Sequence, residues 1–486
     1  MTKITVKPEK KHEVSPYLYM QFMEPLGVSD SSVDAAWDFT EEKWHDKVIE
    51  KTRELAPTMV RFGGCFASYY HWMEAVGPQK DRVPMKNHLW GGVYLNQVGT
   101  HELVDFCRRV NAEPLIVVNM ESEGYPHWQH PKNDTDRTGT AEEAAAWVRY
   151  CNDPEDALRI SHGVREPYDV KYWQLGNETS YSNGGELGFT SDEAAETTRR
   201  FAAAMRKADP SIRIIGWGDE TKHYTHPEIT DQSWCRKMAA LEDVDLIAFH
   251  HHFDSGLPDS VLREHLYRLD FDATWQHFMH AHKSLDAVIQ RMRADRGTKR
   301  LAMTEGHFSF PGKNRGTTLC TWAAGAAYAR CHNVIMRHSD VLDIATLADF
   351  FGNTWQSNAI MLPAPIHSGE AFLMPVGAVM SLFGHHQGKF AADVACSVDV
   401  DTVASVTGNT YYLHVQNTDM HFPREIRLEV EGRKIKKAVM YCIDANPMTE
   451  ISSQNPHVFD PKTVMIEGDT VILPPAAAAA VEIETE

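Results

Sequence analysis

Short runs of apolar and β-branched residues alternate with longer amphipathic segments as far as about residue 350. Such runs, bounded by polar or turn-forming residues, are typical of strands buried on both faces of a parallel sheet. Eight of them stand out: Tyr17–Glu24, Thr58–Phe62, Pro114–Asn119, Val170–Leu175, Ile212–Trp217, Asp245–His250, Arg300–Thr304 and Asp343–Asp349. Eight parallel strands with intervening helices over ~350 residues predict an α/β fold, a (β/α)8 TIM barrel with long loops.

The segments between these runs have helical spacing of apolar residues. We expect helices over Glu41–Glu54, Thr100–Val110, Ala141–Cys151, Ser191–Ala208, Gln232–Leu241, Thr274–Asp295 and Thr317–His338. Thr190 precedes the fourth of these, and Glu193 follows it at the spacing of a capping box. A doubly wound sheet would need fewer strands or two domains.

After Ala371 the pattern changes to short alternating strands separated by turn signals, which is typical of a β-sandwich. The expected strands are Thr402–Thr407, Thr410–Val415, Glu425–Val430, Lys437–Ile443, Thr463–Ile466, Thr470–Leu473 and Ala478–Ile483. Lys3–Pro8 is too polar to begin the barrel, and we expect it to join this sheet because chain termini often lie close together. The predicted division is therefore 1–15 with the sandwich, 16–370 as the barrel, and 371–486 as the sandwich.

Composition narrows the function classes. The 486 residues include 48 Lys plus Arg against 67 Asp plus Glu, a formal net charge of −19. A surface this acidic repels phosphate backbones and anionic lipid, so no nucleic-acid or membrane partner is expected. No stretch approaches the ~18 apolar residues of a membrane helix, and Met1–Lys11 lacks the apolar core of a secretion signal. The 8 cysteines are scattered, as in reduced cytoplasmic proteins without disulfides or structural zinc.

Polar residues end most of the predicted strands. In a (β/α)8 barrel the active site is built at the carboxyl ends of the strands, so these residues are the candidates for chemistry. They are Glu24, Gly63-Gly64-Cys65, Asn119, Asn177-Glu178, His250-His251-His252, Glu305 and Asp349.

Glu178 and Glu305 end the fourth and seventh strands, and both project into one mouth. A pair of carboxyl groups suits glycoside hydrolysis, in which one protonates the leaving oxygen while the other attacks the anomeric carbon. The simpler interpretation, that each is a solvated loop residue, suits a single glutamate better than a pair in this frame.

The three consecutive histidines suggest either sugar contacts or a metal. Alternation along a strand turns His250 and His252 to one face and His251 to the other. We favour sugar-contacting or carboxylate-orienting roles for His250 and His252 over plain packing, and metal binding comes third because the first strand lacks an H-x-H ligand pair. Trp72, in the loop after the second strand, is a candidate platform for a sugar face.

Several segments together resemble the family 51 glycoside hydrolases of clan A, whose best-known members are α-L-arabinofuranosidases. The resemblance extends from Phe22 to Asp349 and rests on Phe22–Gly27, Val60–Ala67 continuing through Tyr70-His71-Trp72 to Gly77-Pro78, Trp90-Gly91-Gly92, Ala112–Asn119, Trp147–Asn152 and Val170–Glu178. It implies a barrel with a C-terminal β-sandwich completed by an N-terminal strand. It also implies Glu178 as acid/base, Glu305 as nucleophile, and Glu24, Cys65 and Asn177 as contacts of the furanose ring. Many members are cytoplasmic oligomers.

The departures from the family pattern lie in the site. The usual Arg-x-Pro-Gly-Gly is shortened to Arg61-Phe62-Gly63-Gly64. His252 stands where the family commonly has Tyr, Gly306 where it has Trp, and Asp349 where it has Gln. Added polar groups and a lost aromatic wall change which ring fits.

The sequence therefore predicts a retaining exo-glycosidase, without a cofactor or metal, that forms a homo-oligomer in the cytoplasm. The preferred substrate is an α-L-arabinofuranoside on a plant-derived oligosaccharide. Within the class, another furanoside, a β-linked pyranoside or a β-glucan stays open. Outside the class, the alternatives are a carbohydrate-binding barrel that has lost catalysis and a metal-dependent barrel hydrolase.

Overall fold

The computed structural model describes residues 2–121, 137–180, 189–219, 233–309, 316–396 and 400–486. Its centre is a parallel sheet in the order β13-β12-β11-β10-β9-β8-β5-β2. The strands are β2 (Gln21–Met23), β5 (Met59–Phe62), β8 (Glu113–Val118), β9 (Tyr172–Leu175), β10 (Arg213–Trp217), β11 (Leu246–Phe253), β12 (Arg300–Phe308) and β13 (Leu342–Ile344).

Backbone contacts between the two edge strands close this sheet into a barrel. Tyr17 forms a parallel bridge with Ile344. The amide of Met20 donates to the Ala345 carbonyl at 2.9 Å, and the amide of Ala345 donates to the Tyr17 carbonyl at 3.1 Å. The predicted (β/α)8 barrel is confirmed.

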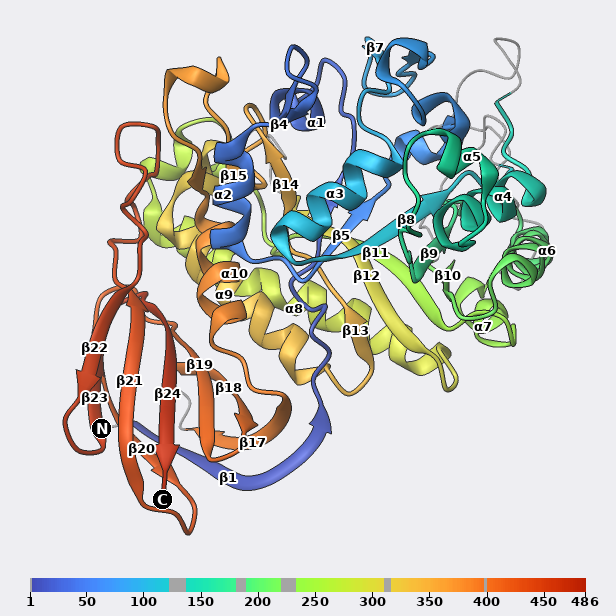
Figure 1. Cartoon of the computed structure of the whole chain (residues 1–486). Helices are drawn as coiled ribbons and strands as arrows, with labels where there is room; N and C mark the ends of the chain where they lie inside the picture. Colours follow the sequence, from blue (N-terminus) through green and yellow to red (C-terminus); the bar gives the residue numbers. More distant parts are fainter. Residues whose placement is uncertain (1, 122–136, 181–188, 220–232, 310–315, 397–399) are drawn as a thin grey trace.

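Helices surround the barrel (Figure 1). They are α1 (Ser32–Ala36), α2 (Asp46–Leu55), α3 (Thr100–Val110), α4 (Ala141–Asn152), α5 (Ala157–Ser161), α6 (Ser191–Ala208), α7 (Trp234–Ala239), α8 (Phe271–Asp295), α9 (Trp322–Arg337) and α10 (Pro375–His385). The capping box is present at α6, where the Glu193 amide donates to Thr190 Oγ1 at 3.2 Å and the Thr190 amide to Glu193 Oε2 at 2.8 Å. The helix expected over Gln232–Leu241 corresponds to α7, and its first expected residue, Gln232, lies outside the described residues. No helix in the described ranges combines the length and apolar character needed to cross a membrane.

The eighth strand differs from the prediction. β13 ends at Ile344, and Asp349 instead begins β14 (Asp349–Gly352), which forms a separate small sheet with β15 (Asn358–Met361) and β16 (Phe372–Leu373). Between the two strands the Thr346 hydroxyl contacts both the carbonyl and the amide of Ala348, at 3.2 and 3.4 Å. This local turn takes the chain out of the barrel ladder before Asp349.

The C-terminal strands form one sheet of nine, in the order β22-β21-β24-β19-β18-β17-β1-β20-β23. Their bounds are β17 (Phe390–Cys396), β18 (Val400–Thr407), β19 (Thr410–Asn417), β20 (Arg424–Val430), β21 (Ile435–Ile443), β22 (Lys462–Ile466), β23 (Thr470–Leu473) and β24 (Ala478–Thr485). Strands from both halves of this sheet contribute to one hydrophobic core, as the two layers of a sandwich do.

The N-terminal strand β1 (Thr2–Glu13) joins this sheet, running antiparallel to β17 and parallel to β20 (Figure 1). Ile4 and Val6 of β1 are fully buried in its core. The division of the chain at residues 15 and 370 stays a proposal. Helix α10 begins after residue 370 in the sequence, yet it packs against α9 and β15. This helix therefore belongs with the barrel.

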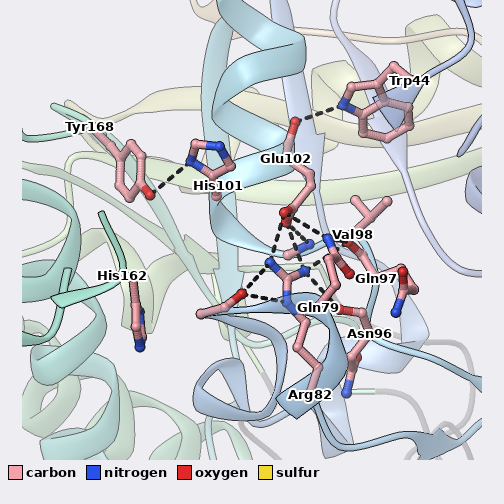
Figure 2. A network of polar contacts seen from close by, with 12 residues as sticks. Trp44, Gln79, Arg82, Asn96, Gln97, Val98, His101, Glu102, His162 and Tyr168 are labelled. Carbon is pink, nitrogen blue, oxygen red and sulfur yellow. Dashed lines mark hydrogen bonds and ion pairs between the residues drawn. The ribbon is translucent and has the colours of Figure 1, made fainter. Parts of the chain in front are cut away.

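The long connection between β5 and α3 is held by a buried ion pair. This connection contains one short hairpin, formed by β6 (Met85–Lys86) and β7 (Val93–Tyr94). A second hairpin, formed by β3 (Trp37–Asp38) and β4 (Lys43–Trp44), precedes α2. Arg82 donates to both Glu102 oxygens, at 3.0 and 2.8 Å, and to the carbonyls of Gly77, Asn96 and Gln97 (Figure 2). One arginine thus ties this connection to the first turn of α3.

Candidate active site

Glu178 reaches the barrel mouth through an unusual backbone turn after β9. Gly176 and Glu178 both have positive φ, 71° and 50°. A glycine adopts this region without strain, whereas a glutamate rarely does, and such residues cluster at functional sites. The turn leaves Glu178 only 3% exposed.

Glu305 is brought beside His250 by a β-bulge between β11 and β12. Phe249 pairs with Met303, but His250 pairs with Glu305, so Thr304 is the extra residue. A bulge turns the following side chains to the other face of the strand. Without the bulge, His250 would pair with Thr304, and the Glu305 side chain would point away from the barrel mouth.

His250 connects the two glutamates. Its Nδ1 lies 2.8 Å from Glu178 Oε1 and 3.6 Å from Glu305 Oε2, and its Nε2 lies 2.9 Å from Thr304 Oγ1. Burial, followed by the charge of Arg61, holds the His250 pKa well below its ordinary 6.5, so the ring is neutral. Nδ1 accordingly accepts a hydrogen bond from a protonated Glu178 or donates one to an ionised Glu178. The Thr304 hydroxyl is the hydrogen-bond partner of the other ring nitrogen, Nε2.

Arg61 was not predicted as a site residue, yet its guanidinium donates hydrogen bonds to three side chains of the site. Fully buried on β5, it donates to Glu305 Oε1 at 2.8 Å, Asn177 Oδ1 at 2.6 Å and Gln174 Oε1 at 3.0 Å. An arginine inside an otherwise apolar strand was the signal available in the sequence, because a charge in that place needs buried partners.

The environments of the carboxyl groups separate their protonation states. Burial, then the charges of Glu305 and Glu24, raise the pKa of Glu178 well above its ordinary 4.5. Burial also raises the pKa of Glu305, but the charge and hydrogen bond of Arg61 oppose this rise. Glu178 is therefore the better proton donor of the two, and Glu305 the better anion.

Glu24, which ends the first strand, lies at the same mouth. Its Oε1 accepts the indole N–H of Trp90 at 2.8 Å, and burial followed by the charge of Glu305 raises its pKa to about 8. Gly64 (φ 148°) passes so close that a Cβ there would lie 2.1 Å from Glu24 Oε2. Cys65 follows and is buried, and burial followed by the charge of Glu24 raises its thiol pKa, so the thiol is neutral.

Two of the buried amide atoms that lack a hydrogen-bond partner within the described parts of the chain belong to residues at the barrel mouth. They are Asn177 Nδ2 and Asn119 Oδ1, whereas Asn119 Nδ2 donates to the Arg137 carbonyl at 2.8 Å. Leaving a buried polar atom unpaired costs free energy. A ligand hydroxyl at each atom would remove that cost.

His252 and Asp349 also lie at this mouth, joined by a residue that was not predicted. The rings of His252 and His307 are 4.4 Å apart, and His307 Nε2 lies 4.0 Å from Asp349 Oδ2. His251 points away, toward Ser284 of α8 at 3.1 Å, as strand alternation predicts. A Cβ on Gly306 would lie 3.0 Å from the Thr346 carbonyl, which leaves little room for the family's Trp.

Trp72 lies elsewhere. Only 2% exposed, it stacks on Trp147 and donates its indole N–H to the Glu143 carbonyl at 3.1 Å. It packs the loop onto α4 and presents no face to a sugar. The aromatic pair at the mouth is instead Trp90 and Trp355, with ring centroids 5.3 Å apart.

One group of three side chains has the composition of a metal site. Glu178, His252 and Glu305 each offer a ligand atom, and these atoms lie within 4.8 Å of one another. An imidazole and two carboxylates suit zinc. The arrangement thus supports either acid and nucleophile chemistry by the two carboxyl groups or metal binding between them.

Comparisons with known proteins match the barrel to arabinofuranosidases. A family described as "Alpha-L-arabinofuranosidase 1 domain" matches residues 51–256. Alpha-L-arabinofuranosidase C of Emericella nidulans is 34% identical over 226 residues, 45% of this chain and 42% of that protein. An intracellular exo-alpha-(1->5)-L-arabinofuranosidase of Acetivibrio thermocellus is 32% identical over 267 residues, 52% of this chain and 48% of that protein.

These matches span a little under half the length of the two curated relatives. The fold extends the likeness over nearly the whole chain. The crystal structure of the GH51 arabinofuranosidase from Xanthomonas axonopodis pv. citri covers 99% of both chains with a TM-score of 0.81 at 20% identity. The chain is therefore a protein similar to GH51 arabinofuranosidases in the sequence of its barrel and in its fold.

Proposed function

We propose that this protein is a retaining exo-glycoside hydrolase with Glu178 as acid/base and Glu305 as nucleophile. The observation that carries the proposal is the closeness of the two carboxyl groups around His250. An oxygen of Glu178 and one of Glu305 lie within 4.8 Å of each other. Retaining enzymes hold the two carboxyl groups about 5–5.5 Å apart, whereas inverting enzymes leave roughly 6.5–9.5 Å for a water.

The neighbours of each glutamate support its role. Glu178, kept protonated by burial and by adjacent carboxylates, gives its proton to the glycosidic oxygen while Glu305 attacks the anomeric carbon. Arg61 stabilises the ionised nucleophile through its 2.8 Å hydrogen bond. In the second step Glu178 is the base that activates water. Neutral His250 can hydrogen-bond to Glu178 in both protonation states, because its Nδ1 lies 2.8 Å from Glu178 Oε1.

The proposed substrate is an α-L-arabinofuranoside on a plant-derived oligosaccharide. The names of the two curated relatives, arabinofuranosidases both, support this choice. Glu24, Asn177 and Asn119 supply polar atoms for the ring hydroxyls. Another furanoside and a β-linked pyranoside or β-glucan stay as alternatives, because His252 and Asp349 depart from the family pattern.

A cytoplasmic homo-oligomer is the proposed form. All 8 cysteines are free thiols in the structure, which suits a reducing compartment. Light scattering and fractionation test these two proposals.

A metal-dependent hydrolase is the second candidate, because Glu178, His252 and Glu305 have a metal-site composition. Dialysis against a chelator separates the two candidates. The glycosidase keeps its rate after metal removal, while the metal enzyme loses it and regains it when zinc is restored.

A panel of 4-nitrophenyl glycosides, assayed with chelator present, tests the proposed function. We expect turnover of furanosides, complete loss in Glu305→Gln, and little change in the matched variant Glu113→Gln. Glu113 begins β8, so it lies at the opposite end of the barrel from the mouth. Turnover of no glycoside, or full activity in Glu305→Gln, would refute the proposal.

A further inference from the structure

Three polar side chains form a line that leads away from the two glutamates: His252, His307 and Asp349. A His252 ring nitrogen is within 4.8 Å of oxygens of Glu178 and Glu305. The His307 ring lies 4.4 Å beyond at an angle of 37°, and Asp349 follows at 4.0 Å. The line therefore begins at the reactive centre and ends on β14.

The hydrogen bonds of His307 decide which atom it presents. Its Nδ1 is 2.9 Å from the carbonyl oxygen of Phe308, which only accepts, so Nδ1 carries the hydrogen. The other ring nitrogen, Nε2, faces Asp349. Asp349 is itself held by the Ser357 hydroxyl, which donates to its Oδ2.

The gap between these two acceptors fits hydroxyl groups. At 4.0 Å, Nε2 and Oδ2 are too far apart for a direct hydrogen bond. Hydroxyl oxygens at about 2.8 Å from each atom fit between them. A hydroxyl donates to a carboxylate, and it can pair with a ring nitrogen as donor or as acceptor. A ligand group with neighbouring hydroxyls, one at each of these atoms, is therefore complementary to the pair.

A pentofuranose does not supply enough hydroxyls for the whole site. Glu24, Asn119 and Asn177 already offer partners for the ring hydroxyls on the β2, β8 and β9 side of the mouth. His307 and Asp349 are 7% and 4% exposed, so a bound sugar that covers His307 Nε2 and the Asp349 carboxylate without hydrogen-bonding to them carries a cost. A substrate with further hydroxyls outside the ring avoids that cost.

We infer that His252, His307 and Asp349 form a subsite for an exocyclic vicinal diol. A hexofuranoside, one of the other furanosides kept above as alternatives, is then preferred to the α-L-arabinofuranoside that the names of the relatives suggest. The inference rests on the proposed glycosidase function. β-D-Galactofuranose has the ring configuration of α-L-arabinofuranose and differs by one CH(OH) unit in its side chain. That unit creates the vicinal diol which arabinose lacks.

The test compares kcat/KM for 4-nitrophenyl β-D-galactofuranoside and α-L-arabinofuranoside. We expect the ratio to favour the galactofuranoside in the wild type and to fall about tenfold to a hundredfold in Asp349→Asn and in His307→Phe. Phe keeps the ring contact with His252, so this second variant serves if Asp349→Asn does not fold. His251→Phe, on the opposite face of β11, is the matched control and keeps the ratio.

Binding separates failure of this inference from failure of the proposed function. Methyl β-D-galactofuranoside and methyl α-L-arabinofuranoside are titrated by calorimetry into the wild type and both variants, which needs no turnover. Tighter galactofuranoside binding that is lost in the variants supports the subsite even if neither aryl glycoside is cleaved. A ratio or affinity that favours arabinofuranoside, or that the variants leave unchanged, overturns it.

Discussion

The indole N–H of Trp90 donates to Glu24 Oε1 at 2.8 Å. This bond crosses from the long β5–α3 connection to the end of β2, so a loop residue sets the position of a strand-end carboxyl group. The loop is fixed in turn by Asn87, whose Oδ1 accepts the Trp90 amide at 2.9 Å and whose Nδ2 donates to the Pro25 carbonyl at 2.8 Å.

Replacing Trp90 by Phe removes the donor and keeps an aromatic ring against Trp355. Because this hydrogen bond opposes the rise in the Glu24 pKa, its loss should favour protonated Glu24 still further. We expect kcat/KM to fall about twofold to tenfold, the range for losing a hydrogen bond to a neutral group. Steady-state kinetics measure this, and an unchanged kcat/KM would show that the bond has no role in substrate binding.

Asp30 positions Trp355 from outside the mouth. Its carboxylate accepts the amides of Asn353, Thr354 and Trp355 and the side-chain amide of Asn358, at 2.8–3.3 Å. We expect Asp30→Ala to release this loop and to raise KM more than it lowers kcat, with partial rescue in Asp30→Asn.

The matched control is Asp46→Asn, at an aspartate of α2 whose side chain is 73% exposed. In the contrary case KM rises and kcat falls by the same factor in both Asp30 variants, in proportion to the loss of thermal stability. That result would mean that Asp30 only supports the fold.

Glu178→Ala and Glu305→Ala should fail differently. Glu305→Ala abolishes turnover of every substrate, since no covalent intermediate forms. Glu178→Ala cripples substrates with poor leaving groups but spares glycosylation by activated aryl glycosides, and azide restores the second step. Rates across a series of leaving groups, with and without azide, measure this, and the same leaving-group dependence in both variants argues against separate roles.

Glu24 makes stability depend on pH. Its pKa rises from an ordinary 4.5 to about 8 on folding, so between these values the folded protein keeps a proton that the unfolded chain releases. Stability should therefore fall as pH rises through this window and level off above about pH 8. Glu24→Gln should make this fall shallower, while Glu9→Gln on the exposed face of β1 should not. Chemical denaturation at several pH values tests this, and an identical slope in Glu24→Gln and the wild type would contradict it.

The sequence predicted the bounds of those helices whose ends are fixed by capping residues next to them in the chain. The bounds of α3 and α6 were predicted correctly because their ends carry their own caps, such as Thr190 with Glu193. The join of the N-terminal strand to the C-terminal sheet also followed from the polarity of Lys3–Pro8.

Features that depend on neighbouring strands could not be predicted. The bulge at Thr304 exists only because β12 pairs with β11, and alternation reads the same in either register. Asp349 was expected to end the eighth strand because Ile344–Ala348 is apolar apart from Thr346, yet β13 ends at Ile344. Trp72 lies against α4 because tertiary contacts decide the path of a long loop.

The central claim, a double displacement by Glu178 and Glu305, is tested most directly by the stereochemistry of the first product. Proton NMR during hydrolysis of an aryl furanoside records the anomeric signal before mutarotation mixes the two anomers. The account predicts that the sugar is released with the anomeric configuration of the substrate. Release of the opposite anomer would contradict it.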